Sequence, residues 1–119
     1  MSGEQVTRVM TGAEFRAQQY ARMTEAAFQS HVERLARWHR WDFFHVYNSR
    51  RSRPGYPDLH LWHPVHGSMF RELKTMKGRQ SPAQLEVEAS MRAAGIDVGV
   101  WRPADLDGRI DDELRGMKG

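Results

Sequence analysis

A short hairpin in the middle of the chain is the strongest constraint on its fold. Residues 58–63 and 68–75 have the pattern of two strands, and residues 64–67, Pro-Val-His-Gly, have the composition of a tight turn. The length of the turn fixes which residues of the two strands lie opposite each other. A turn centred near Val65 places Asp58 opposite Glu72, one at the start of the first strand and one near the end of the second.

This register would bring two acids and an amine into one small volume. Opposite residues on one face of a hairpin have Cβ atoms roughly 4.5–5.5 Å apart, and Lys74 projects from the same face as Glu72. Two carboxylates at that distance repel each other unless a cation lies between them or one is protonated. A turn shifted by half a residue would leave only diagonal contact. A surface hairpin with a cross-strand Glu–Lys pair is the alternative interpretation.

The remaining elements can be placed by caps and hydrophobic spacing. Thr11 with Glu14 and Ser81 with Gln84 form capping boxes that begin helices. Phe28 begins an apolar stripe with the spacing of a buried helix face. We expect helices over about 12–23, 25–39 and 82–94, strands over 42–47 and 97–101, and buried side chains at Trp38, Trp41 and Phe70. This order predicts an α/β fold, with a mixed sheet of about four strands flanked by helices.

Composition narrows the class of protein. The 119 residues fit one domain, and the absence of cysteine excludes a disulfide scaffold, a thiolate zinc site and a cysteine nucleophile. No signal peptide and no membrane-spanning segment is expected, so we predict a cytoplasmic protein. The net charge of +3 conceals a basic middle and an acidic end. A basic middle is typical of a domain that binds nucleic acid, although solvated faces explain many charge clusters.

Five blocks of sequence follow one another in a familiar order. They are Glu25 with Gln29, Gly55-Tyr56-Pro57-Asp58, Glu72-Leu73-Lys74-Thr75, Lys77-Gly78-Arg79, and Ser81-Pro82-Ala83-Gln84. Together they resemble the PD-(D/E)xK nucleases, and most closely their virus-type replication-repair nuclease (VRR-NUC) branch. The resemblance covers about residues 24–103. It predicts a nuclease domain there, between an N-terminal helical extension (1–23) and an acidic C-terminal tail (104–119).

The resemblance implies a restriction-endonuclease-like core and metal-dependent hydrolysis of DNA. Asp58, Glu72 and the backbone carbonyl of Leu73 would bind the metal, and Glu25 would bind it directly or through water. The expected ion is Mg²⁺, for which Mn²⁺ would substitute, since Mg²⁺ is usually held by one or two carboxylates with waters and phosphate oxygens. Lys74 would be the catalytic lysine.

Other residues would orient the substrate. Gln84 would orient a water or a phosphate, although it is explained equally well as a helix cap. The expected phosphate contacts are Arg50, Arg51, Arg53, Lys77 and Arg79. His60, His63 and His66 suggest a zinc site only on a helix, and their segment is predicted to be strand and turn.

Members of this branch that consist of one small domain resemble junction resolvases. The resemblance therefore implies a homodimer that cleaves branched DNA such as a Holliday junction, and it is compatible with a phage gene expressed in a bacterial host. A nicking or flap-type nuclease is the second possibility. A non-catalytic DNA-binding module is the third, although no acid or lysine of the motif is missing.

Overall fold

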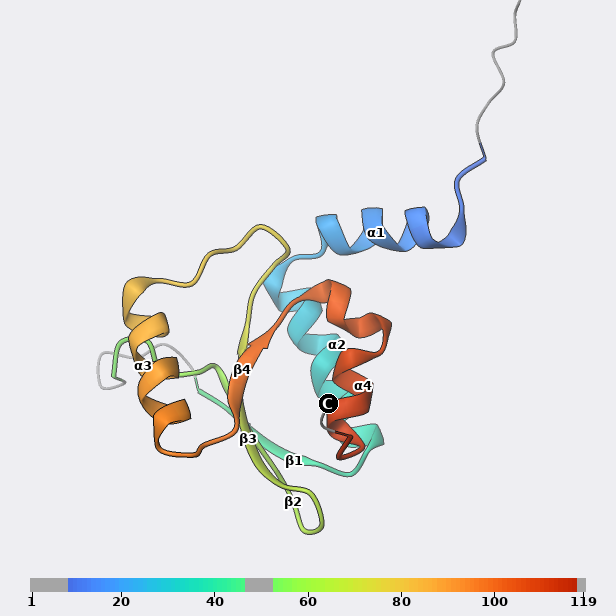
Figure 1. The fold of residues 1–119 in the computed structure, drawn as a ribbon. Coiled ribbons are helices and arrows are strands. Elements are labelled where there is room, and N and C mark those ends of the chain that lie inside the picture. Colours follow the sequence, from blue (N-terminus) through green and yellow to red (C-terminus); the bar gives the residue numbers. More distant parts are fainter. Residues whose placement is uncertain (1–8, 47–52, 118–119) are drawn as a thin grey trace, which may run out of the picture.

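The computed structural model describes residues 9–46 and 53–117. Arg50 and Arg51 lie outside these residues. In chain order the elements are α1 (Gly12–Arg22), α2 (Glu25–Trp38), β1 (Asp42–His45), β2 (Leu59–His63), β3 (Gly67–Leu73), α3 (Pro82–Ala93), β4 (Val98–Trp101), the 3₁₀ helix η1 (Pro103–Asp107) and α4 (Arg109–Leu114) (Figure 1). The predicted order of helices and strands is confirmed through β4.

The four strands form one mixed sheet in the order β1-β2-β3-β4. The first three are antiparallel, and β4 is parallel to β3 after the crossover through α3. The predicted hairpin register is confirmed, because Leu59 pairs with Arg71 and His60 pairs with Phe70. An α/β sheet of this kind is consistent with a restriction-endonuclease-like core.

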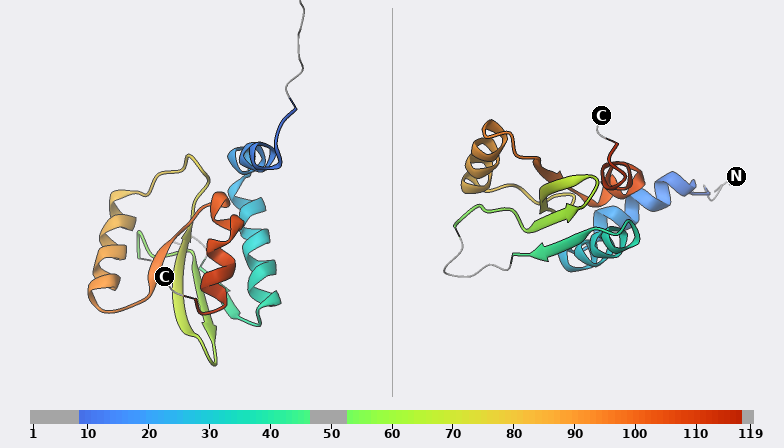
Figure 2. Two further views of the ribbon diagram at one scale, coloured as in Figure 1. Left: turned by 45° about the vertical axis from the view of Figure 1, so that its right-hand side comes forward. Right: turned by 90° about the horizontal axis from the view of Figure 1, so that it is seen from below.

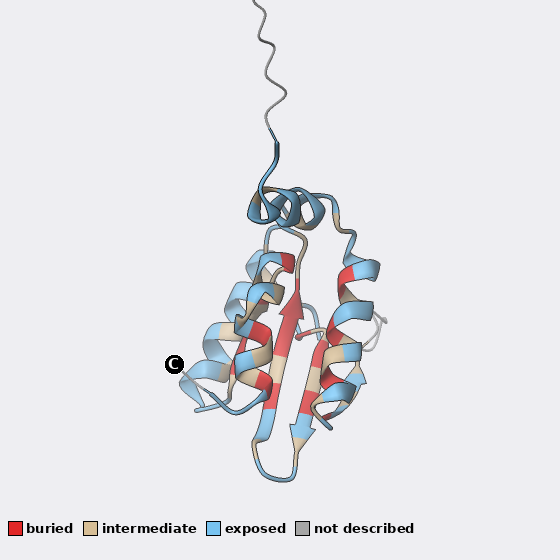
Figure 3. Cartoon of the chain, turned by 90° about the vertical axis from the view of Figure 1, so that its right-hand side faces the viewer, coloured by how far each residue is buried: buried red, intermediate tan, exposed pale blue. Residues whose placement is uncertain are grey.

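Helices cover the two faces of the sheet unequally. On one face α2 and α4 lie side by side against the strands (Figures 1 and 2). Their apolar side chains form the core together with the inward residues of β2, β3 and β4, and Figure 3 shows this buried strip between the helices. On the other face α3 covers the β3–β4 half of the sheet and buries Val87.

The segment that follows β4 differs from the expected tail. Residues 103–114 fold into η1 and α4, and Ile110 and Leu114 are fully buried in the core. Acidic residues dominate this segment in the sequence, yet Ile110 and Leu114 have the i, i+4 spacing that places them on one helix face. The sequence from 103 to 114 is therefore part of the folded unit.

The N-terminal helix α1 lies at the end of the molecule and has no buried residue. Its capping box forms as predicted, with the Glu14 amide donating to the Thr11 hydroxyl at 3.1 Å. Its contacts to the body are polar: the Tyr20 hydroxyl donates to Asp107 at 2.6 Å, and Arg16 lies 3.4 Å from the same carboxylate.

The prediction that Trp38 is buried is wrong. Trp38 is 80% exposed, whereas Trp41 is buried as predicted and Phe70 is half-buried. The buried stripe of α2 runs through Phe28, Val32 and Ala36, so a residue two positions after Ala36 projects away from it.

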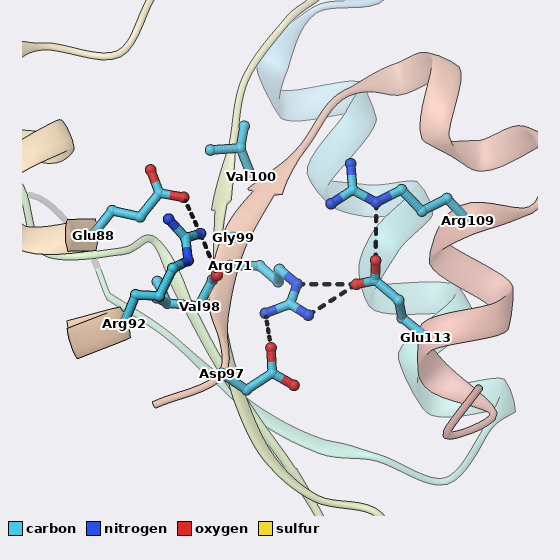
Figure 4. A pocket seen from close by; sticks show the side chains of 9 residues that line it. All are labelled: Arg71, Glu88, Arg92, Asp97, Val98, Gly99, Val100, Arg109 and Glu113. Carbon is cyan, nitrogen blue, oxygen red and sulfur yellow. Dashed lines mark hydrogen bonds and ion pairs between the residues drawn. The ribbon is translucent and has the colours of Figure 1, made fainter. Parts of the chain in front are cut away.

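A buried charge network joins the sheet to α4. Arg71 is 5% exposed, and its guanidinium lies 2.9 Å from Asp97 and 2.9 Å from Glu113 (Figure 4). It also donates to the Phe70 carbonyl and lies over the ring of Trp101. Burial acts to raise the pKa of Glu113, but hydrogen bonds from Arg71 and Trp101 hold that pKa below its usual value. Every charge in the centre of this network therefore has a partner.

Candidate active site

The predicted catalytic residues meet in one cavity, where the start of β2 and the end of β3 face the start of α3. The cavity has a volume of about 400 Å³. Its walls include Glu25, Arg53, Gly55, Asp58, Glu72, Lys74 and Gln84. Residues from four separate parts of the sequence thus line one cavity.

Glu72 is the most unusual group in the cavity. It is 5% exposed, and its Oε1 has no hydrogen-bond partner among the described residues. Burial and the nearby charge of Asp58 raise the pKa of Glu72 to about 7, although Lys74 acts in the opposite direction. A buried oxygen without a partner is costly to the folded protein. It is therefore a ready ligand for a cation.

Asp58 is positioned by the backbone of the neighbouring strand. Its Oδ2 accepts a hydrogen bond from the Leu73 amide at 2.8 Å. The N–H and C=O of one strand residue point to the same side, so the Leu73 carbonyl also points toward Asp58. Asp58 and Glu72 line the same cavity, and hard carboxylate and carbonyl oxygens are the ligands that suit Mg²⁺.

Lys74 and Gln84 both contact the carboxylate of Glu72. The Lys74 ammonium lies 3.4 Å from Glu72 Oε2, and the Gln84 side-chain amide donates to the same oxygen. Gln84 is also the third residue of α3, where its Oε1 accepts from the Ser81 amide at 2.8 Å. Both sequence interpretations of Gln84 are therefore compatible with its contacts, because one side-chain end caps the helix and the other contacts the site.

Glu25 begins α2 and is exposed at the cavity. Within residues 9–46 and 53–117, no group of three or more His, Asp or Glu side chains is arranged to hold a metal ion. Glu25, Asp58 and Glu72 line one cavity without forming a ready three-acid metal site.

Gly55 lets the loop before β2 pass close to α3. Its φ is +88°, and a Cβ at this position would lie 2.3 Å from the backbone oxygen of Ala83. Both the dihedral angle and the contact exclude a side chain. The G-x-P-D motif therefore packs its loop against the first turn of α3.

One of the described residues predicted to contact phosphate lies at this cavity. Arg53 lines it, while Lys77 and Arg79 are exposed on the loop between β3 and α3. Sequence reasoning missed Arg102, whose guanidinium donates to the carbonyls of Thr75 at 2.6 Å and Gly78 at 2.7 Å. Arg102 thus holds the backbone of the basic loop, and no motif in the sequence indicates this role.

The histidines do not converge. His60 hydrogen bonds with Ser68 on one face of the sheet, whereas His63 and His66 stack on each other beside Trp41. Partial burial lowers the pKa of His60. These contacts give no support to a zinc site.

Comparison with known families agrees with this geometry. The sequence model of the VRR-NUC domain matches residues 5–105. The chain belongs to the VRR-NUC family. Neither the search of curated proteins nor the search of solved structures gave a match.

VRR-NUC domains are nuclease domains, and the chain is accordingly a nuclease with DNA as its substrate. The match begins at residue 5, so the VRR-NUC region includes α1, which the sequence motifs alone left outside. No helix among the described residues is long and apolar enough to cross a bilayer.

Proposed function

We propose that the chain is a Mg²⁺-dependent endodeoxyribonuclease that acts selectively on branched DNA, in the manner of a Holliday-junction resolvase. One observation supports the metal requirement: Glu72 is buried beside Asp58, and its Oε1 has no hydrogen-bond partner within the described part of the chain. Among the described residues, Lys74 and Gln84 contact only Oε2 of Glu72, and a divalent cation would satisfy Oε1 as well.

Asp58, Glu72 and the Leu73 carbonyl would hold the ion, with Glu25 reaching it through water from the cavity mouth. Mn²⁺ would substitute for Mg²⁺. A bound ion of this kind lowers the pKa of a coordinated water and neutralises charge on a phosphodiester.

The chain's own side chains would position the reacting groups. Lys74 is fixed by Glu72, so its ammonium can stabilise the negative charge that develops on the phosphate or exchange a proton with the attacking water. Gln84 keeps Glu72 in place and can orient a water. Arg53, Lys77 and Arg79 would bind phosphates on either side of the cleaved bond.

A homodimer would match the two-fold symmetry of a four-way junction. The exposed side chains of α1, with Phe15 at 55% exposure, are available for such an interface. Sedimentation at micromolar concentration tests this part, because a species of only 13.8 kDa would contradict the dimer. We place the enzyme in the cytoplasm, and a phage gene acting in its bacterial host is compatible with this proposal.

Cleavage of end-labelled DNA tests the enzyme itself. Four-way junction, flap and linear duplex substrates would be incubated with Mg²⁺, Mn²⁺ or EDTA, beside an Asp58→Asn control. We expect metal-dependent cleavage of the junction and its loss in Asp58→Asn. Preferred cleavage of the flap would favour a flap-type nuclease, and equal cleavage of all substrates would overturn the structure selectivity. Tight DNA binding without cleavage in either metal would indicate a non-catalytic module.

A further inference from the structure

A row of aromatic side chains lies on the same sheet face as the two acids. In the strand register Phe44 pairs with His60, and His60 pairs with Phe70. Asp58 precedes His60 by two residues and Glu72 follows Phe70 by two, so both acids share this face. The aromatic row and the acids are therefore adjacent.

These rings form a continuous surface. His60 stacks on Phe70 with centroids 4.2 Å apart, and the ring of Tyr56 meets the ring of Phe70 edge-on. Trp62 lies beside His60, with centroids 5.0 Å apart. We call Phe44, Tyr56, His60, Trp62 and Phe70 the aromatic platform.

The platform is open at the β1–β2 end of the sheet. Phe44 is 61% exposed, and Tyr56 and Trp62 are each 39% exposed. The helix on this face, α3, packs on β4 at the opposite edge. An exposed group of large apolar rings beside a site is typical of a binding surface.

We propose that the aromatic platform binds the bases of a single-stranded DNA segment next to the phosphodiester bond that is cleaved beside Asp58 and Glu72. This inference rests on the proposed function, and it adds the kind of DNA that the site accepts. Residues two apart on a strand are about 6.6–6.8 Å apart, the rise of about two nucleotides along one strand of DNA. A strand cleaved at the acids therefore passes over the platform within its next few nucleotides.

The chemistry of the surface favours unpaired DNA over other occupants. Every base has a face that stacks on an aromatic ring, so binding tolerates any sequence, whereas bases inside a duplex already stack on each other. A second copy of the chain seated here would cover Asp58 and Glu72 as well, and would close the site to DNA. The platform therefore selects flaps and other branched DNA in which unpaired nucleotides lie beside a duplex.

Binding measured in EDTA tests the platform separately from cleavage. The probe is fluorescently labelled oligothymidine, with linear duplex as the comparison. Phe44→Ala and Trp62→Ala should each weaken oligothymidine binding by about tenfold and leave duplex binding unchanged. Trp38→Ala is the matched control, because Trp38 is 80% exposed on α2, which packs on the other face. The control should bind like the original chain.

Other results would overturn the proposal. Unchanged oligothymidine binding in Phe44→Ala and Trp62→Ala would do so, as would an equal loss of duplex binding. A dimer that dissociates in Trp62→Ala during sedimentation would assign the surface to contact between copies. If Trp62→Ala unfolds, Phe44→Ala still tests the proposal, because the exposed side chain of Phe44 on the edge strand β1 contributes little to folding.

Cleavage by the original chain is scored in a separate assay with Mg²⁺. Platform-dependent binding without cleavage would overturn the proposed enzyme and leave the single-strand surface standing. Cleavage without platform-dependent binding would overturn the single-strand surface and leave the proposed enzyme standing.

Discussion

Arg71 and Glu72 are neighbours in sequence, and each is 5% exposed, yet their surroundings are opposite in kind. Arg71 points to the face covered by α4, where two carboxylates and a carbonyl satisfy it. Glu72 points to the face beside α3, where one oxygen has no partner among the residues described. One strand thus carries a charge that holds the fold together and a charge that the fold leaves incompletely compensated.

Arg71 and Glu72 are equally buried, so the difference lies in how neighbouring groups compensate the charge of each. The pKa of Glu113, which pairs with Arg71, is lowered, whereas the pKa of Glu72 is raised to about 7. Buried groups with strongly shifted pKa values are frequent at functional sites. Substitutions on either side of β3 should therefore affect the protein in different ways.

Replacement of Arg71 should cause the largest loss of stability. Arg71→Met leaves the carboxylates of Asp97 and Glu113 without their shared buried partner, so we expect the free energy of unfolding to fall by about 3 kcal/mol. Urea denaturation at pH 7 measures it. Arg92→Met is the matched control, since its side chain is 60% exposed and it should cost less than about 1 kcal/mol. Equal effects of the two substitutions would refute the structural role of Arg71.

Gly55→Ala should disturb the packing of the loop before β2 against α3, on the Glu72 side of β3. The new Cβ would meet the Ala83 backbone oxygen, so we expect a loss of about 2–3 kcal/mol in stability and reduced cleavage. Gly95→Ala provides the control, because Gly95 also has a positive φ but open space around its Cβ. That variant should lose only about 1 kcal/mol. The difference in stability between the two variants measures the cost of the close contact between residue 55 and Ala83. Equal losses of stability would mean that the loop can move away from α3.

Glu72→Gln should stabilise the metal-free protein while it abolishes cleavage. The raised pKa means that the folded state binds a proton more tightly than the unfolded state, so the contribution of Glu72 to stability falls as pH rises from about 4.5 to about 7. The variant removes this penalty, and we expect a gain of roughly 2 kcal/mol at pH 8.

Urea denaturation in EDTA at pH 4 and pH 8 provides the measurement. Glu72 is mainly protonated in both states at pH 4, so the gain should disappear there. A gain of the same size at both pH values would have a cause other than ionisation.

Addition of Mg²⁺ should have the smallest effect. An ion that binds only the folded state at ten times its dissociation constant stabilises by about 1.4 kcal/mol. The original chain should therefore melt at a higher temperature in Mg²⁺ than in EDTA, and Glu72→Gln should respond less. Calcium would provide a comparison with a larger oxygen-seeking ion. An equal rise in both proteins would place the ion elsewhere.

The sequence predicted the hairpin and its register because turn length and side-chain alternation are local properties. Asp58, Glu72 and Lys74 meet as expected for the same reason. The packing of α4 could not be predicted this way. Ile110 and Leu114 lie among acidic residues, and only their distant partners in α2 and the sheet make them core.

Arg102 and Trp38 illustrate the same limit. Arg102 acts on the loop at Thr75, far away in sequence, through backbone carbonyls that have no sequence signature. Trp38 has a hydrophobic side chain, and its exposure follows from its position around the axis of α2, away from the buried stripe. The partners of each residue come from other parts of the chain.

Gln84 connects two requirements that are usually independent. In a capping box glutamate and glutamine are interchangeable, so the stability of α3 alone would accept either. The other end of this side chain lies on the carboxylate of Glu72, where a second negative charge would repel. An engineer who optimised this helix by itself would consider the two residues equivalent, and only the neutral one is compatible with the acid beneath it.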